Sequence, residues 1–172
     1  MDPRVIQTVT EMMCDRGYTV KDDNGEILVC EKNNKSICAY FNTSPKFGIK
    51  HVNEIIADFE KNAYDLCLII HEGTTSSFVK SAMVDKPNVQ LFPSQTLLTN
   101  VTHHDLVPKH ILLSPNDKNN VLQMYRITER NMPLILSSDP ISRYYGAKPG
   151  DMFKIIRKSD SSGTYMTYRL CV

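Results

Sequence analysis

The 172-residue sequence contains no tryptophan, only seven glycines and nine prolines, and no long apolar run. Its apolar stretches, such as residues 66–70, are far shorter than the roughly 20 residues that a membrane-spanning helix needs. Residues 1–4 are not followed by the apolar segment of a secretion signal, so we expect a reducing compartment and no membrane partner. A hydrophobic fraction of 41% and a charged fraction of 23% are typical of an ordinary globular protein.

Cysteines with the spacing of a disulfide framework or a zinc knuckle are also absent. The chain has five cysteines, an odd number in which no two lie two or three residues apart. We therefore expect each of them to be a small, buried hydrophobic residue. They are Cys14, Cys30, Cys38, Cys67 and Cys171.

The sequence lacks the motifs of common enzyme classes. No Asp or Glu is followed two residues later by Lys, a pattern frequent in metal-dependent nucleases, and there is no glycine-rich phosphate loop or nucleophile elbow. The one histidine cluster, His103, His104 and His110, has no cysteine close to it and belongs to no carboxylate or thiolate ligand motif. A surface or capping role is favoured over zinc binding. We predict no catalytic residue, no metal and no cofactor.

The net charge of +1 is unevenly distributed along the chain. Residues 1–100 carry 10 basic and 13 acidic groups, a net charge of −3, whereas residues 101–172 carry 10 and 6, a net charge of +4. This asymmetry favours two modules with different partners. An excess of four charges is too small to predict a nucleic-acid-binding protein by itself, and a protein-docking surface fits equally well.

The chain begins with the pattern of a helix followed by a hairpin. Asp2 as N-cap and Pro3 at the first helical position open the helix, and Gly17 ends it. Short apolar runs at residues 27–30 and 37–41, separated by polar residues, indicate two strands that form a hairpin.

Helical and strand patterns then alternate. Residues 52–59 carry apolar side chains at helical spacing, residues 66–70 indicate a central strand, and the hydroxyls of residues 74–77 indicate caps of a helix before a strand at 89–92. Strands joined by crossover helices are normally parallel neighbours, so we expect a mixed sheet layered with helices in a first domain, residues 1–98.

The second half begins with two capped helices. Ser114 and Pro115 open one, while Asp139 and Pro140 open a shorter one that Gly146 can end. The remaining chain carries the pattern of a hairpin.

Residues 152–157 and 164–171 indicate two strands, and the Ser, Asp and Gly content of residues 158–163 suits the loop between them. Helices followed by a hairpin indicate a small α+β module over residues 99–172, so the fold class of the whole chain is α+β, or mixed α/β. Three glycines are expected to adopt backbone angles denied to other residues. They are Gly146, Gly150 and Gly163.

Three blocks of the second half, residues 100–110, 138–146 and 154–170, resemble a known family in the order in which they occur. They are similar to the assembly domain of the small common subunit of multi-subunit DNA-dependent RNA polymerases, which the eukaryotic polymerases I, II and III share and which has an archaeal counterpart. The first half resembles more loosely the amino-terminal jaw domain of the eukaryotic subunit, through residues 14–18 and 45–50 and the strand at 66–70.

Two departures from the family pattern accompany this resemblance. The stretch between Val20 and Phe41 is shortened against the cellular eukaryotic pattern, and Pro149 stands where a basic residue is usual before Gly150. They suggest a divergent lineage, such as a copy encoded by a large DNA virus.

The resemblance implies a non-catalytic, structural subunit in transcription. It would dock on the largest polymerase subunit and neighbouring small subunits, and help to form the jaw around downstream duplex DNA, with weak, sequence-independent contact. The location would be the nucleus for a cellular protein, and the virion or the infected-cell cytoplasm or nucleus for a viral one. A free-standing transcription regulator or adaptor with the same fold, and a nucleic-acid-processing enzyme, are the alternatives.

Basic and aromatic residues of the second half are candidates for the subunit interface. Strand alternation places Lys154 and Ile155 on opposite faces, while Arg157 and Lys158 lead into the loop, so we expect a basic, exposed rim. The alternatives are a solvated face and direct phosphate contact. The candidate interface residues are Pro108, His110, Asp139, Pro140, Arg143, Tyr144, Lys154, Arg157, Tyr168 and Arg169.

In the first half, Lys46 and Lys50 flank Gly48 in a predicted loop. They are the candidates for weak contact with DNA phosphates, and ordinary solubilising lysines are the alternative.

Overall fold

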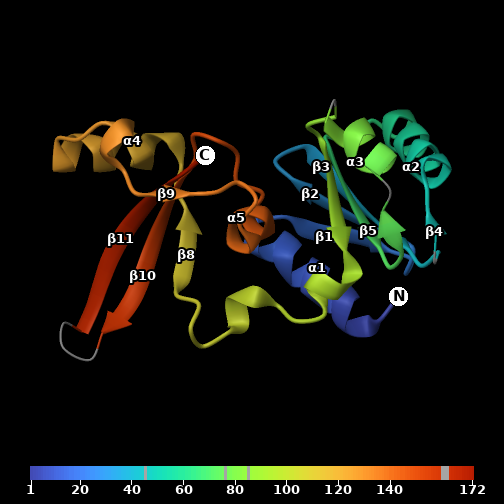
Figure 1. Ribbon diagram of the computed structural model, residues 1–172, viewed down its shortest axis with the longest axis horizontal. Coiled ribbons are helices and arrows are strands. Elements are labelled where there is room, and N and C mark those ends of the chain that lie inside the picture. The colour runs from blue at the N-terminus through green and yellow to red at the C-terminus, as the bar shows by residue number, and fades with distance from the viewer. Residues whose placement is uncertain (45, 76, 85, 160–162) are drawn as a thin grey trace. The chain divides into compact units, whose positions relative to one another are not determined.

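The computed structural model describes residues 1–44, 46–75, 77–84, 86–159 and 163–172 (Figure 1). The chain divides into two compact units, Met1–Thr99 (unit 1) and Asn100–Val172 (unit 2). Both combine helices with a sheet, which confirms the α+β class. Among the described residues, no helix has both the length and the apolar character needed to cross a membrane.

Helix α1 (Pro3–Asp15) opens unit 1 with the predicted boundaries. The Asp2 carboxylate caps it by accepting a hydrogen bond of 2.9 Å from the Arg4 N–H. Gly17, with φ of 82°, follows the last turn, and a Cβ there would lie 2.9 Å from the Lys32 ammonium. One face of the helix is buried because its apolar residues recur every three or four positions. The buried residues are Val5, Thr8, Val9, Met12 and Met13.

The sheet of unit 1 has five strands in the order β1-β2-β3-β5-β7. The first three pair antiparallel and the last three pair parallel, which confirms the predicted mixed sheet. The strands are β1 (Thr19–Asp23), β2 (Ile27–Lys32), β3 (Lys35–Asn42), β5 (Leu66–His71) and β7 (Val89–Pro93).

The predicted hairpin of β2 and β3 closes through a two-residue turn. Asn33 and Asn34 have φ of 49° and 62°, and two positive φ values are typical of the turn whose twist matches that of a hairpin. The apolar run of β5 is the buried centre of the sheet, with Cys67 and Leu68 fully inaccessible, as its continuous hydrophobicity predicted.

Helices cover both faces of this sheet (Figure 1). The crossovers α2 (Ile49–Lys61) and α3 (Ser77–Val84) lie on one face, where a buried cluster joins Val52 of α2 to Ile69 of β5. On the opposite face lies α1, where the Arg16 guanidinium donates a hydrogen bond of 3.2 Å to the Gln90 side chain of β7.

Two expectations for unit 1 were incomplete or wrong. Thr74 and Thr75, predicted as helix-capping residues, form the short strand β6 (Thr74–Thr75), which pairs in parallel with β4 (Lys46–Phe47); residue 76 of the proposed cap lies outside the described residues. Strand β1 was missed because all five of its residues are exposed, so it has no alternation of apolar and polar side chains.

Unit 2 contains a four-stranded sheet in the order β8-β10-β11-β9. The predicted hairpin forms its centre, with Lys154 opposite Tyr168 and Arg157 opposite Tyr165. Strand β8 pairs antiparallel with β10, and β9 pairs parallel with β11. The edge strands β8 and β9 were missed because so few residues show no periodicity. The strands are β8 (Lys109–Leu112), β9 (Leu134–Ile135), β10 (Met152–Ser159) and β11 (Gly163–Cys171).

The two predicted helices of unit 2 lie against opposite faces of this sheet. Val121 and Leu122 of α4 (Pro115–Tyr125) pack with Met152 and Leu170. Residues at and beyond α5 (Pro140–Tyr145) pack on the other face, which carries Phe153, Ile155 and Cys171. We call these the α4 face and the α5 face.

The glycines of unit 2 adopt the backbone angles predicted for them. Gly146 ends α5 with φ of 66°, and Gly150 turns the chain into β10 with φ of 95°. The Gly150 carbonyl accepts a hydrogen bond of 2.6 Å from the Lys118 ammonium, so this turn is tied to α4. Gly163, with φ of 67°, begins β11.

The expectation that all five cysteines are buried is wrong for Cys14. This residue lies on the exposed side of α1, next to the buried Met13, because successive helical positions point in different directions. Cys30, Cys38 and Cys171 are buried, as is Cys67, and all five thiols are free.

Candidate partner-binding surfaces

The basic residues of the β10–β11 hairpin do not form the single rim expected from the sequence. Strand β10 continues to Ser159, so Arg157 and Lys158 lie within the strand and not in a loop. Alternation then places Lys154 and Lys158 on the α4 face and Arg157 on the α5 face. Each face therefore carries its own basic and aromatic side chains.

The α4 face exposes apolar side chains beyond the end of α4. Ile111 of β8 and Met166 of β11 are 36% and 55% exposed, and Ile156 between them is half-buried. Lys109 and Lys154 flank this strip. An exposed apolar patch with a polar rim is typical of a protein–protein interface.

Tyr168 lies at the inner end of the α4 face. Its ring contacts that of Tyr125 from α4 at a centroid distance of 5.9 Å with an interplanar angle of 60°. Burial raises the pKa of the Tyr168 hydroxyl above its ordinary value. This predicted interface residue is thus half-buried and fixed by a contact within unit 2.

On the α5 face, two of the predicted interface residues take part in the interior of unit 2. Tyr144 is only 3% exposed, and its hydroxyl accepts a hydrogen bond of 3.1 Å from the Asn100 amide. Arg143 is half-buried, and burial lowers the pKa of its guanidinium. Tyr144 therefore connects α5 to Asn100, and neither side chain projects freely into solvent.

Pro108 and His110 are joined by a local hydrogen bond of 2.7 Å between the His110 Nδ1 and the Pro108 carbonyl. Because a carbonyl can only accept, Nδ1 carries the proton. The imidazole meets the edge of Phe153 at 5.9 Å, and burial lowers its pKa. This histidine therefore packs against the sheet, where burial favours its neutral form.

Asp139, Pro140 and Arg169 have structural contacts as well. The Asp139 carboxylate caps α5 by accepting a hydrogen bond of 2.8 Å from the Ile141 N–H, and Pro140 occupies the first turn. The Arg169 guanidinium donates 3.0 Å to the Leu134 carbonyl and so links β11 to β9. These contacts within unit 2 explain why an aspartate, a proline and an arginine stand at these positions, even without a partner protein.

In unit 1, the two candidate lysines do not lie in the predicted loop, because Lys46 belongs to strand β4 and Lys50 to the first turn of α2. The β4–β6 pairing places Lys46 opposite Thr74, although the Lys46 side chain lies outside the described residues. Lys50 is exposed in the first turn of α2, whose N-cap, Gly48, makes no side-chain hydrogen bond. The first N–H groups of α2 thus lie beside a cation, an arrangement that suits an anion.

An aromatic stack forms around Phe47 of β4. Phe47 lies 5.1 Å from the His71 ring at an angle of 11°, and 6.2 Å from the His51 ring at 27°. His71 is 3% exposed, its Nδ1 bonds the Gly73 carbonyl at 2.7 Å, and burial lowers its pKa. The stack anchors β4 to the end of β5.

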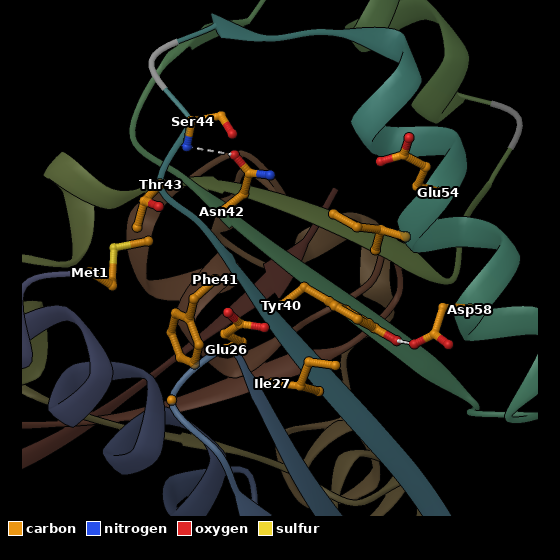
Figure 2. Close-up of a pocket in the computed structure, with 12 residues that line it drawn as sticks. Met1, Glu26, Ile27, Tyr40, Phe41, Asn42, Thr43, Ser44, Glu54 and Asp58 are labelled. Atoms are coloured by element: carbon orange, nitrogen blue, oxygen red, sulfur yellow. Dashed lines mark hydrogen bonds between the residues drawn. The ribbon is translucent and has the colours of Figure 1, made fainter.

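A pocket of 580 Å³ opens where the β2–β3 hairpin meets α2 (Figure 2). Glu26, Glu54 and Asp58 line it, with no Lys or Arg among its described lining residues. The Tyr40 hydroxyl donates a hydrogen bond to Asp58, and burial together with this bond raises the pKa of Tyr40 far above its ordinary value. The acidic lining disfavours phosphate, so this pocket does not extend the candidate DNA contact.

Across the described ranges, no three His, Cys, Asp or Glu side chains are arranged to hold a metal ion.

Comparison of the sequence with known proteins shows which family the chain is similar to. Residues 99–171 match the family described as RNA polymerase Rpb5, C-terminal domain. Subunit rpabc1 of DNA-directed RNA polymerases I, II and III from Dictyostelium discoideum is 32% identical, in an alignment that covers 98% of this chain and 96% of the relative. The chain belongs to this family of shared RNA polymerase subunits.

Further members extend the same result. The RPABC1 subunits of Caenorhabditis elegans and Caenorhabditis briggsae are each 30% identical, over 98% of this chain and 94% of the relative. The resemblance found in the three sequence blocks is therefore confirmed. The prediction of a structural, non-catalytic polymerase subunit that takes part in transcription is confirmed as well.

The alignments with the family run over 189 and 199 positions, whereas this chain has 172 residues. The relatives therefore contain residues that this chain lacks. The placement of the shortening between Val20 and Phe41 stays a prediction. That region contains the short edge strand β1 and the two-residue turn at Asn33 and Asn34.

Sequence reasoning missed the exposed apolar residues of the shared-subunit fold. Ile111, Ile156 and Met166 are ordinary core types, so hydrophobicity alone assigns them to the interior. The one available signal was the length of the hairpin, since strands that outrun the helix packed on them leave their ends uncovered.

Proposed function

We propose that unit 2 docks this shared subunit on the largest subunit of RNA polymerase and on neighbouring small subunits, and that unit 1 forms part of the jaw around downstream DNA. The observation that carries the proposal is that the match to the family domain spans residues 99–171, which is nearly all of unit 2. Membership in a complex with other polymerase subunits follows from the family itself.

The α4 face supports the docking role of unit 2. Ile111 and Met166 remain exposed on it, and burial of such side chains by a partner is worth about 25 cal/mol per Å² of apolar surface. Lys109 and Lys154 at its border favour an acidic partner surface, which would fix orientation and speed association. The interface residues with contacts inside unit 2 would act indirectly: Arg169 holds β11 to β9, and Tyr144 holds α5 to Asn100.

The first turn of α2 supports a role for unit 1 near DNA. Lys50 is exposed there, and the uncapped N–H groups of α2 favour an anion such as a backbone phosphate. Lys46 is the second candidate. Contacts of this kind carry no sequence information and weaken with salt, as expected for a jaw that must slide along any template.

The proposed location follows the polymerase. It is the nucleus for a cellular copy, and the virion or the infected-cell cytoplasm or nucleus for a copy that serves a large DNA virus.

Affinity purification of a tagged chain from its native setting tests the proposal. Mass spectrometry should recover both large polymerase subunits near equal stoichiometry, and the eluate should synthesise RNA. Recovery of the chain alone, in salt that preserves known polymerases, would instead identify a free-standing regulator with the same fold. Metal-dependent cleavage of DNA by the purified chain would point to an enzyme.

A further inference from the structure

A groove of 680 Å³ lies in unit 2 between the segment that precedes β8 and the outer part of the β10–β11 hairpin. It is open to solvent and separate from the hydrophobic clusters under α4 and α5. Its lining residues come from two stretches, residues 105–109 on one side and residues 156–158, Thr164 and Tyr165 on the other.

Several of the residues that line the groove are apolar, and we call them its floor. Leu106 is 86% exposed, the highest value among the large hydrophobic side chains that the structure describes. Val107 and Ile156 lie half-buried beside it, and Tyr165 contributes a ring that is 39% exposed. An exposed leucine and an exposed aromatic ring that line the same groove give a partner's apolar side chain a place to bury.

The groove also has cationic lining residues, which we call its rim, with Lys109 and Lys158 on the α4 face and Arg157 on the α5 face. They line the groove against Asp105 as its one described carboxylate. All three cations are exposed, and within the described ranges none of them forms a salt bridge. The charge of the groove is therefore complementary to a segment that carries two or more carboxylates.

One edge of the groove is an open strand. Pairing of β8 with β10 stops at Lys109 opposite Ile156, because Pro108 has no N–H and the Val107 N–H bonds the His104 carbonyl at 2.8 Å. No described strand lies on this side of β10 beyond Ile156.

The direction of the open backbone groups follows from the register. The Met152 carbonyl accepts a hydrogen bond of 2.9 Å from the Leu113 N–H, so the backbone groups of Met152 point towards the β8 side. Along a strand, the backbone groups of successive residues point to alternate sides. The N–H and C=O of Lys158, six residues further along β10, therefore point into the groove. An extended chain placed there can pair with them.

We propose that this groove binds an extended, acidic segment of a partner protein. The backbone of that segment continues the line of β8 and pairs with Lys158, its carboxylates meet Lys109 and Arg157, and an apolar side chain packs between Leu106 and Tyr165. The proposal deepens the docking role given to unit 2 and rests on it, because it names the chemistry of the segment that a polymerase subunit would offer.

A protein segment fits the groove better than nucleic acid. A phosphate backbone would use the three cations but would leave the exposed Leu106 and the half-buried Ile156 against charged oxygens. It would also offer no alternating N–H and C=O groups to the open edge at Lys158. A peptide uses the charge, the apolar floor and the strand edge together.

Photo-cross-linking in the native setting tests the proposal directly. Leu106 in the full-length, tagged chain is replaced with p-benzoylphenylalanine, and the cross-linked peptides are identified by mass spectrometry. The matched control carries the same group at Met124, a 78% exposed side chain of α4 outside the groove. We expect the groove position, and not the control, to cross-link to one acidic, extended segment.

The possible outcomes separate this proposal from the proposed function. A cross-link to an acidic segment of a polymerase subunit supports both, while a cross-link to such a segment of another identified protein supports the groove and contradicts the polymerase assignment. Cross-links to DNA or RNA, or none from a chain that co-purifies with polymerase, would overturn the groove proposal and leave the polymerase assignment intact.

Charge reversal provides a second measurement. The double variant Arg157→Glu/Lys158→Glu should lower recovery with polymerase about tenfold, as expected from the loss of two rim ion pairs. The control Arg130→Glu/Lys148→Glu changes the same number of exposed charges away from the groove and should leave recovery unchanged. Equal recovery of the two double variants, each with an unfolding temperature near that of the parent, would contradict the proposal.

Discussion

Unit 1 buries nearly all of its large hydrophobic side chains, whereas unit 2 leaves many of them in solvent. Among the described residues, unit 1 exposes three large hydrophobic side chains in 99 residues, and unit 2 exposes nine in 73. Unit 1 covers both faces of its sheet with α1, α2 and α3, while the hairpin of unit 2 extends beyond α4. The difference supports the proposal that unit 1 completes its own core and that a partner covers the exposed residues of unit 2.

The charges of the two units sharpen this contrast. The acidic excess falls in unit 1, whose pocket carries Glu26, Glu54 and Asp58, and the basic excess falls in unit 2 beside its exposed apolar strips. A cationic border around apolar residues combines affinity with orientation for an acidic protein surface.

The largest effect should follow from removing residues 164–172. This truncation deletes nearly all of β11, the strand between β10 and β9, so unit 2 should unfold while unit 1 keeps its sheet. Recovery with polymerase should be abolished, and limited proteolysis should leave a stable fragment close to Met1–Thr99. Normal incorporation of the truncated chain would refute the docking role of unit 2.

A paired substitution tests where each unit uses its hydrophobic residues. Ile69→Ala removes a fully buried side chain of unit 1 and should lower the free energy of unfolding of that unit by about 2–4 kcal/mol. Met166→Ala, at a side chain 55% exposed in unit 2, should change the free energy of unfolding of unit 2 by less than about 0.5 kcal/mol. It should instead reduce incorporation of the chain into polymerase. Urea unfolding and co-purification measure the two effects. A large stability loss in Met166→Ala would mean that unit 2 is complete without a partner.

Buried histidines should make both units less stable in mild acid. Burial lowers the pKa of His71 in unit 1 and of His110 in unit 2, so the unfolded chain binds more protons just below its ordinary histidine pKa of about 6.5. Stability is therefore complete above that pH and falls as the pH is lowered towards the folded-state pKa values. Urea midpoints between pH 7.5 and 5 should show this fall.

Substitution by phenylalanine separates the contributions of the two histidines. His71→Phe keeps a ring beside Phe47, and His110→Phe keeps one beside Phe153, but neither can be protonated. Each variant should flatten the pH dependence of its own unit. An unchanged slope in both variants would show that other groups cause the acid sensitivity.

The smallest effect is expected at the candidate DNA contact of unit 1. Lys50→Glu should weaken binding of polymerase to downstream DNA a few-fold at low salt, and should reduce the salt dependence of binding by roughly one phosphate contact. Lys61→Glu, an exposed lysine at the other end of α2, is the matched control. Equal effects of the two variants would reduce Lys50 to an ordinary solubilising lysine.

Local patterns in the sequence determined much of the architecture. The N-caps Asp2, Ser114 and Asp139, the apolar run of β5, and the turn at Gly150 each depend on neighbouring residues only, so they could be identified before the fold was known. The three blocks of the second half were specific enough to indicate the family.

The tertiary structure alone decided what pairs with what. Strand β1 has no apolar alternation, and β8 and β9 are too short to show one, so these strands are defined by their pairing with a neighbouring strand. The separation of Lys154 from Arg157 onto opposite faces depended on β10 continuing to Ser159. The exposure of Ile111 and Met166 depended on where α4 stops covering the sheet, because burial is set by contacts between residues far apart in the chain.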